Sequence, residues 1–206
     1  MYVESNNQTL LDHGLPGVDE NLWLLEIEGQ VKDMDKVRYC PATKENPFDA
    51  TVGSWSGQWF GSSKKRWIWG FDVKEPEQGS YAINTWLYGK KVFYVGQQDW
   101  DDYAFLTANP RNSANVPVFV DCKWVDFVAK NNQSCPDDIN LDTGGNHLSV
   151  NGLLVNRHRD QINVGFIDGH AESVHLKDLW SLKWGKGFDT LGPQTRVNGT
   201  PIYQRN

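Results

Sequence analysis

The sequence has no long apolar segment and no excess of basic residues. None of its 206 residues belongs to an apolar run of about 18 or more, the length that a transmembrane helix requires. The chain has 20 Lys and Arg against 26 Asp and Glu, a net charge of −6, whereas surfaces that bind nucleic acid concentrate basic residues. Its basic cluster Lys64-Lys65-Arg66 is short. The sequence therefore excludes a membrane span within these residues and argues against nucleic acid as the main partner.

Cysteine is scarce, and the number of cysteines is odd. The three cysteines allow at most one intramolecular disulfide. Cys122 and Cys135 flank a polar segment and form the favoured local pair, whereas Cys40, next to Pro41, is the other option. Residues 1–5 have neither the basic nor the apolar segment of a signal peptide. We therefore expect any export signal to lie upstream of this sequence.

Tryptophan, in contrast, is abundant, with ten residues in the chain. Glycine (19 residues) and asparagine are also plentiful, and this combination is typical of a β-rich extracytoplasmic domain with many ordered loops. Charged residues make up 22% of the chain and hydrophobic residues 39%, which places it among folded globular proteins. Its length fits one domain.

The N-terminal part predicts a short amphipathic helix. Asp19 can accept hydrogen bonds from the free N–H groups of a helix that runs over residues 20–31. Three apolar residues at helical spacing would form its buried face: Trp23, Ile27 and Val31.

The middle of the chain predicts a long loop region followed by short strands. Residues 40–79 contain Pro, Gly, Ser and several Trp without sustained periodicity, which predicts a long packed loop region. Strands are expected over residues 81–87 and 92–95. Residues 116–120 are interrupted by Pro117, which favours an edge strand or the entry to a strand, because proline donates no ladder hydrogen bond.

The C-terminal part predicts a β-hairpin over residues 162–176. Apolar residues alternate on both sides of Asp168-Gly169, a turn signal. A three-residue loop, which we favour, would place four apolar residues on one face: Ile162, Val164, Val174 and Leu176. Residues 131–151 are polar and predict a loop, residues 179–184 predict a short helix or turn, and the tail from Gly185 is expected to lie irregularly on the surface.

Several segments resemble, in the same order, those of one bacterial family. His158, nine intervening residues and Asp168-Gly169 are similar to the H-X9-DG signature of prepilin-type proteins, which are relatives of type II secretion pseudopilins and type IV pilins. Five further segments resemble the same family: Met1-Tyr2 with Asn6-Asn7, the "CP" segment Val37–Pro41, the "SYxxN" segment Ser80–Asn84, the "vPvfxD" segment Val116–Asp121 and the "LWxLKW" segment Leu179–Trp184. The resemblance extends over nearly the whole chain.

The resemblance implies an architecture for the parent protein. Such proteins begin with a basic leader, a peptidase cleavage site and a long apolar helix, which anchors in the inner membrane and later packs into the core of a filament. Their globular domain is a small antiparallel sheet on the C-terminal half of that helix, with large loops. This sequence lacks the leader and the helix, so we expect it to be the soluble C-terminal domain.

A catalytic use of the signature residues is an alternative. His158 or His170 could act as a base oriented by Asp168, but the candidate nucleophiles Ser149 and Ser173 lack a nucleophile-elbow context. We expect instead that Asp168-Gly169 shapes the hairpin turn and that His158 packs or forms hydrogen bonds near the start of the strand. The prediction is that the protein is not an enzyme and has no catalytic residues.

The polar loop over residues 131–151 contains candidate calcium ligands. Asp138, Asn140 and Asp142 place oxygen ligands at alternate positions, as calcium loops do. The fit to an EF-hand is poor, because the glycine comes one place late and Ser149 stands where a bidentate Glu is expected. Several major pseudopilins carry a loop-bound calcium ion, but a solvated turn is the favoured interpretation. A transition-metal site is weaker still, because no HxH or HxxH spacing occurs among His147, His158, His170 and His175.

Four tryptophans between residues 40 and 79 invite a second interpretation. Flat aromatic faces stack on sugar rings, and Trp67 and Trp69 would point the same way on a strand. The favoured alternative is that these residues pack the loop region onto the sheet. The four candidates are Trp55, Trp59, Trp67 and Trp69.

Together these features predict a single α+β domain with a short N-terminal helix and a three- to five-stranded antiparallel sheet. The family resemblance implies the function of a structural filament subunit of a type II secretion pseudopilus or a related pilus. Its partners would be copies of itself, related subunits and the secretion machinery, and it would face the periplasm or the cell surface, anchored in the inner membrane. No cofactor is expected apart from the candidate calcium ion. The alternative is a carbohydrate- or substrate-binding module that uses residues 40–79.

Overall fold

The computed structural model describes residues 11, 22–47, 59–70, 76–107, 109–133 and 149–190, and it has the expected α+β composition. Its helices are α2 (Trp23–Glu28), α3 (Met34–Val37) and α4 (Gln97–Tyr103). Its strands are β1 (Trp67–Trp69), β2 (Glu77–Gly79), β3 (Tyr81–Asn84), β4 (Pro117–Asp121), β5 (Asp126–Phe127), β6 (Gln161–Phe166) and β7 (Ala171–His175). Four 3₁₀ helices complete the fold: η2 (Thr85–Leu87), η3 (Ser113–Asn115), η4 (Val150–Leu153) and η5 (Leu176–Ser181).

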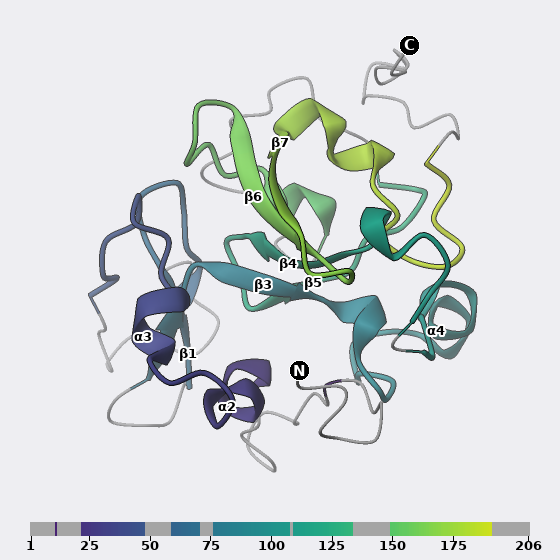
Figure 1. Cartoon of the computed structure of the whole chain (residues 1–206), viewed down its shortest axis with the longest axis horizontal. Helices are drawn as coiled ribbons and strands as arrows, with labels where there is room; N and C mark the ends of the chain where they lie inside the picture. Colours follow the sequence, from purple (N-terminus) through teal and green to yellow (C-terminus); the bar gives the residue numbers. More distant parts are fainter. Residues whose placement is uncertain are drawn as a thin grey trace.

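The main sheet has five strands in the order β5-β3-β4-β6-β7 (Figure 1). Every neighbouring pair is antiparallel except β3 and β5, which run parallel. Strands β1 and β2 form a separate two-stranded antiparallel sheet. The prediction of a small antiparallel sheet is therefore confirmed for four of the five strands.

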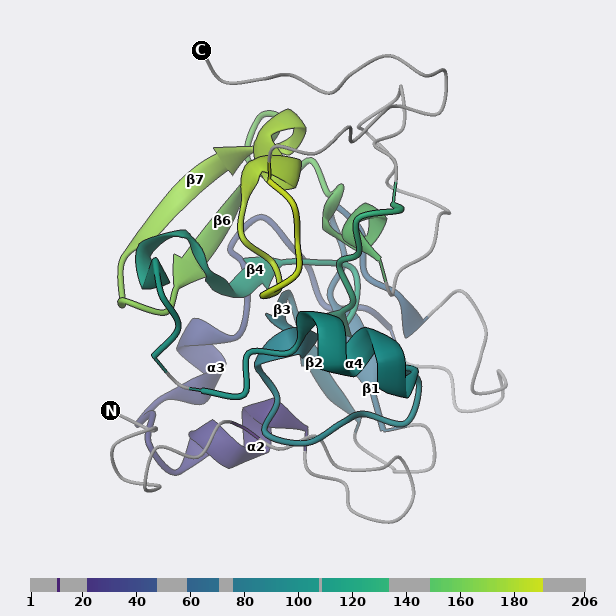
Figure 2. The ribbon, with the colours of Figure 1, turned by 90° about the vertical axis from the view of Figure 1, so that its right-hand side faces the viewer.

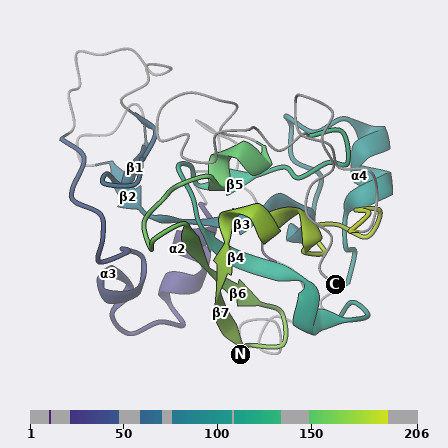
Figure 3. The same cartoon turned by 90° about the horizontal axis from the view of Figure 1, so that it is seen from above.

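Each face of the main sheet contributes to a different hydrophobic cluster. Figure 2 shows α2 and α3 on one side of the sheet and the segment of η5 on the other. Every second residue of β6 is buried and packs in the cluster that contains η4 and η5: Ile162, Val164 and Phe166. The opposite face includes Phe119 of β4, which packs against the cluster of α2. Seen from above, α3 and the β1–β2 sheet lie at one end of the main sheet and α4 lies at the other (Figure 3).

The β6–β7 hairpin has the three-residue loop that the sequence predicted. Ile162 lies opposite Val174, and the N–H of Phe166 donates to the carbonyl of His170 at 2.9 Å. Gly169 has a φ of +93°, a left-handed conformation that glycine adopts without steric cost. A glycine in this conformation at the end of a three-residue loop keeps the strands in register.

The N-terminal helix is shorter than predicted. Helix α2 ends at Glu28, and Gly29 lies at its C-cap, where a residue with low helix propensity favours termination. Trp23 is buried as expected, and Ile27 and Val31 are partly buried against the same cluster. Asp19, the predicted N-cap, lies outside the described residues.

The prediction of a long loop over residues 40–79 was wrong at its C-terminal end. Trp67 pairs with Gly79 and Trp69 with Glu77, which makes β1 and β2. A three-residue strand is too short to show a period, so the pattern could not be recognised in the sequence.

Three further strand predictions need correction in whole or in part. The strand predicted over residues 81–87 ends at Asn84 as β3, and Thr85–Leu87 form η2. Residues 92–95 form a turn in which Val95 N–H donates to the carbonyl of Val92, and both valines are buried in a hydrophobic cluster without pairing in the sheet. Strand β4 lies inside the sheet, so the edge alternative was wrong, whereas the strand-entry alternative is confirmed. Pro117 is tolerated there because it is the first residue of the strand, and the register with β6 shifts between it and Phe119.

The segments around the C-terminal hairpin are more buried than expected. The 3₁₀ helix η5 begins at Leu176, before the predicted 179–184 element. Val150, at the end of the predicted 131–151 loop, and Phe188, in the predicted surface tail, both have buried side chains. Both belong to the cluster beneath β6 and β7, because apolar side chains in irregular segments also lower their free energy by leaving water.

Candidate functional site

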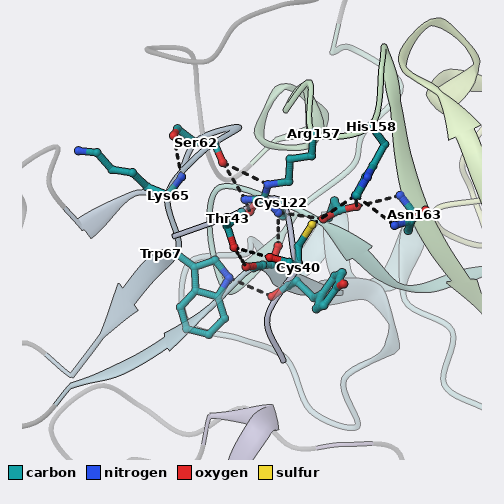
Figure 4. A network of polar contacts seen from close by, with 12 residues as sticks. Cys40, Thr43, Ser62, Lys65, Trp67, Cys122, Arg157, His158 and Asn163 are labelled. Atoms are coloured by element: carbon teal, nitrogen blue, oxygen red, sulfur yellow. Dashed lines mark hydrogen bonds and ion pairs between the residues drawn. The ribbon is translucent and has the colours of Figure 1, made fainter. Parts of the chain in front are cut away.

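A buried polar network lies where the ends of several segments meet (Figure 4). Its centre is Arg157, whose guanidinium is paired with Asp121 while both side chains are 0% exposed. Arg157 Nη1 lies 3.0 Å from Asp121 Oδ1, and its other donors bind the backbone carbonyls of Ser62, Ser80 and Cys122 at 2.5–3.1 Å. A buried charge requires this degree of compensation.

The two carboxylate oxygens of Asp121 have different partners. Oδ1 accepts from Arg157, whereas Oδ2 accepts from the backbone N–H of Asn163 at 2.9 Å and lies 3.2 Å from Nε2 of His158. Strand β4 ends at Asp121, so this carboxylate links the end of β4 to β6 and to the segment before it. One side of Asp121 therefore serves the ion pair, while the other faces His158.

His158 also faces Cys40. Its Nε2 lies 3.3 Å from Cys40 Sγ and 3.1 Å from the amide nitrogen of Asn163. Cys40 and Asp121 have no exposed surface, whereas the His158 side chain is 27% exposed. One ligand atom from each of Cys40, Asp121 and His158 can be chosen so that all three lie within 4.8 Å of one another.

Local hydrogen bonds position these side chains. Cys40 follows α3 and begins a turn in which Thr43 donates to its carbonyl from both its N–H and its hydroxyl, at 2.9 and 2.8 Å. On the other side, Asn156 and Asp160 bind each other through side chain and backbone across the residues that include His158. Asp160 has a φ of +63°, which turns the chain into β6. These local hydrogen bonds hold the backbone of both segments and thereby position Cys40 and His158.

Burial is the main cause of a raised thiol pKa at both described cysteines. Burial raises the pKa of the Cys40 thiol, and the charge of Asp121 raises it further, while a backbone hydrogen bond at Ala42 and the charge of Arg157 act in the opposite direction. Burial raises the pKa of Cys122 to about 12. The Cys122 thiol is free and donates to the carbonyl of Gly152 at 3.3 Å. Cys135 lies outside the described residues, so its pairing with Cys122 stays a prediction.

The residues of the H-X9-DG signature do not form one site. His158 lies before β6, whereas Asp168 and Gly169 lie in the turn after it. Asp168 instead binds His170, with Oδ1 2.6 Å from Nδ1 of the exposed ring. This hydrogen bond holds the pKa of the Asp168 carboxyl below its usual value.

The two candidate nucleophiles of the hydrolase alternative, Ser149 and Ser173, form hydrogen bonds with other residues. Ser149 caps η4, and its Oγ accepts from the N–H of Asn151. Ser173 donates to the side chain of Asn163. Within the described residues these hydrogen bonds run to Asn151 and Asn163 and not to a histidine, whereas a nucleophilic serine is activated by an adjacent base.

Hydrogen bonds also connect other segments of the family resemblance, at both ends of β3. Ser80 Oγ lies 2.7 Å from Thr43 Oγ1, and the carbonyl of Ser80 accepts from Arg157. At the far end of β3, the amide of Asn84 donates to the carbonyls of Pro117 and Trp184 at 3.0 and 2.7 Å. These bonds connect the "SYxxN", "vPvfxD" and "LWxLKW" segments through one buried asparagine.

The candidate stacking tryptophans are core residues where they are described. Trp59 and Trp67 have 1% and 0% of their surface exposed, and Trp67 donates its indole N–H to the carbonyl of Tyr81 at 3.0 Å. Trp69 is partly buried and contacts Trp124. Their burial favours the packing interpretation, since Trp59 and Trp67 present no ring face to a ligand. Trp55 lies outside the described residues.

The candidate calcium ligands Asp138, Asn140 and Asp142 also lie outside the described residues, as does His147. The calcium site therefore stays a prediction. The sequence did not identify the grouping of Cys40, Asp121, Arg157 and His158. Three of them belong to segments of the family resemblance, and Arg157 directly precedes the signature histidine. The signal that could have indicated this grouping was the occurrence of polar residues within or beside the predicted apolar strands.

An apolar groove opens on the sheet face next to α2 and α3. It has a volume of about 330 Å³. Its lining combines helix residues with Phe119 of β4 and with residues of β6 and β7, among them Trp23, Ile27, Val37, Gly165 and Ala171. Val37 is 54% exposed, so this side of the sheet is incompletely covered by the described helices.

No helix in the described ranges combines the length and the apolar character that crossing a membrane requires. Comparisons with protein-family models, with curated proteins and with solved structures gave no match to this chain.

Proposed function

We propose that this chain is the globular domain of a pilin-like filament subunit of the bacterial cell envelope, related to type II secretion pseudopilins. The observation that carries the proposal is the convergence of residues from the resembling segments. Cys40, Asp121 and His158 meet at one point, although 118 positions separate the first from the last. A chance likeness in short segments gives no reason for their polar residues to meet in one network.

A physical argument gives this convergence its weight. Buried polar groups are costly unless they are hydrogen-bonded, so each such residue constrains the segments that satisfy it. Arg157 and Asn84 each bind carbonyls from segments far apart in the chain. Residues with such constraints are those that a family of domains with variable loops would retain. They act here as positioning residues of the fold, and the proposal assigns no catalytic role.

The groove next to α2 and α3 gives the proposal a mechanism. Its lining is predominantly apolar, with Trp23, Ile27 and Phe119 beside the exposed Val37. An amphipathic or apolar helix buries its side chains in such a groove, and the family resemblance implies a long apolar helix in the parent protein. We infer that this helix occupies the groove and that assembly proceeds through contacts between subunits.

The test uses the full-length gene product, co-produced with a prepilin peptidase and a pilus assembly system. The expected result is N-terminal cleavage, detected by mass spectrometry, and the protein in the sheared filament fraction. Val37→Asp should strongly reduce the amount of sheared protein, because it places a carboxylate in the groove. Phe93→Asp is a matched control, since Phe93 is 56% exposed and does not line the groove.

The outcomes separate the parts of the proposal. Absence of cleavage and of filaments for the unmodified protein would overturn the assignment as a filament subunit. Equal loss with both variants would show that the groove has no special role, although the subunit function would stand.

A further inference from the structure

Three potential metal ligands converge from three segments of the chain. Cys40 follows α3, Asp121 ends β4, and His158 precedes β6. Nε2 of His158 lies 3.3 Å from Cys40 Sγ and 3.2 Å from Asp121 Oδ2. Thiolate, imidazole and carboxylate are the ligand types that zinc uses in proteins.

The two separations from Nε2 of His158 are close to those of a tetrahedral metal site, and Cys40 and Asp121 each offer a ligand atom within 4.8 Å of the other. Zinc binds sulfur at roughly 2.3 Å and nitrogen or oxygen at roughly 2.0–2.1 Å, so its ligand atoms are about 3.3–3.6 Å apart at tetrahedral angles. The two recorded separations from Nε2, 3.2 and 3.3 Å, lie at or just below this range. A coordinated ion therefore requires only small movements of these side chains.

Three polar groups surround Nε2 of His158, and the hydrogen bonds among them, including one between the Cys40 thiol and Asp121, would give way to a bound ion. This nitrogen carries either one hydrogen or one lone pair, yet it faces a carboxylate oxygen, a cysteine sulfur and the amide of Asn163. A catalytic triad is also a poor description, because a triad histidine contacts its nucleophile and its carboxylate through different ring nitrogens. In this cluster one nitrogen faces both Cys40 and Asp121, as in ligands that share an ion.

The surrounding contacts hold the ligands in place. Arg157 occupies Oδ1 of Asp121 and leaves Oδ2 directed towards His158, and the N–H of Asn163 fixes that same oxygen. Outer contacts of this kind orient metal ligands in proteins. Cys40 and Asp121 are fully buried, whereas His158 is 27% exposed. Solvent therefore reaches the cluster from the His158 side.

We propose that Cys40, Asp121 and His158 bind one divalent transition-metal ion, with zinc as the best match to their chemistry. The fourth position would hold water or a ligand from outside the cluster. Coordination would deprotonate the Cys40 thiol and would join α3, β4 and the segment before β6 through one ion. This proposal does not depend on the function as a filament subunit.

Cobalt binding to the reduced, chelator-treated chain tests the proposal. One equivalent of Co²⁺ should produce a sulfur-to-cobalt charge-transfer band together with the visible bands of tetrahedral cobalt, and Zn²⁺ should abolish both. Cys40→Ser should remove the charge-transfer band. His158→Gln should weaken binding by more than about 100-fold, since even outer-contact changes cost 10–100-fold in affinity.

Two variants serve as controls. Cys122→Ser removes a buried thiol that instead donates to Gly152, and Cys135→Ser removes the remaining cysteine; both should keep the band. Because His158 is partly exposed, His158→Gln should keep the circular dichroism of the unmodified protein. The absence of a charge-transfer band in the unmodified chain, or its persistence in Cys40→Ser, would overturn the proposal.

Discussion

Arg157 Nη1 lies 3.0 Å from Asp121 Oδ1, and neither side chain has any exposed surface. The pair joins the segment before β6 to the end of β4, and it is surrounded by carbonyls from three further residues. An ion pair in such a place contributes little net stability compared with apolar side chains, but removal of one partner is costly.

Arg157→Met should therefore lower the free energy of unfolding by about 3–5 kcal/mol, because it leaves the Asp121 carboxylate buried without its cation. Urea denaturation followed by circular dichroism measures this change. Lys36→Met is the control, since Lys36 and Asp33 form an exposed pair whose side chains are 78% and 54% accessible, and its loss should cost less than about 1 kcal/mol. Similar losses in both variants would show that burial of the Arg157 pair does not matter.

Gly79→Ala should destabilise the packing of β1 on β2. A Cβ at Gly79 would lie 2.1–2.7 Å from ring atoms of Trp67, and forced overpacking of this kind costs typically about 1–3 kcal/mol. Gly29→Ala is the matched control, because a Cβ there meets nothing within 4 Å. Thermal unfolding should show a lower midpoint for Gly79→Ala alone. An unchanged midpoint would mean that Trp67 can move away at little cost.

The Asp168 carboxyl in the β6–β7 turn should titrate at a lower pH than an ordinary aspartate. The hydrogen bond from His170 lowers the pKa of Asp168 below its usual value of 3.8, so the folded state favours the ionised carboxylate. The linked stability is present above that usual value and is lost as the pH falls through the lowered pKa. Carbon-detected NMR titration of Asp168 should give a midpoint below 3.8, and His170→Ala should raise it. A midpoint that His170→Ala leaves unchanged would exclude this cause.

Cys122 should resist alkylation in the folded protein. Burial raises its thiol pKa to about 12, so little thiolate forms at pH 8, and the reagent has no access. The stability linked to this protonated thiol is retained below the usual pKa of 9.0 and is lost as the pH rises towards 12. Iodoacetamide labelling and peptide mass spectrometry should show modification only after unfolding. A disulfide-linked peptide with Cys122 and Cys135 would instead demonstrate the pairing predicted from the sequence.

The sequence predicted the parts of the fold that depend on nearby residues. The β6–β7 hairpin follows from the alternation of Ile162 and Val164 with polar residues and glycine, together with a turn signal at Gly169. Both are local properties. Helix α4, in contrast, buries only Trp100 among its seven residues, so it shows no apolar stripe and depends on its tertiary contacts.

The candidate site was beyond prediction for a different reason. Cys40 and His158 are 118 positions apart, and their contact depends on how β4 and β6 pair. The central place of β4 was likewise hidden, because Pro117 is compatible with both an edge strand and the entry to an inner strand. Of the three residues that meet, the sequence indicated only His158 as a candidate metal ligand, and their grouping follows from the order of the strands.

The strand order also has a kinetic consequence. In the five-stranded sheet, β6 and β7 pair across a three-residue loop, whereas β3 and β4, and likewise β4 and β6, are joined by connections of more than thirty residues. Isolated hairpins form within about 1–10 μs, while distant pairings must first overcome the entropy of closing long loops. The C-terminal hairpin is thus the earliest part of the sheet that can form, and during synthesis it emerges last.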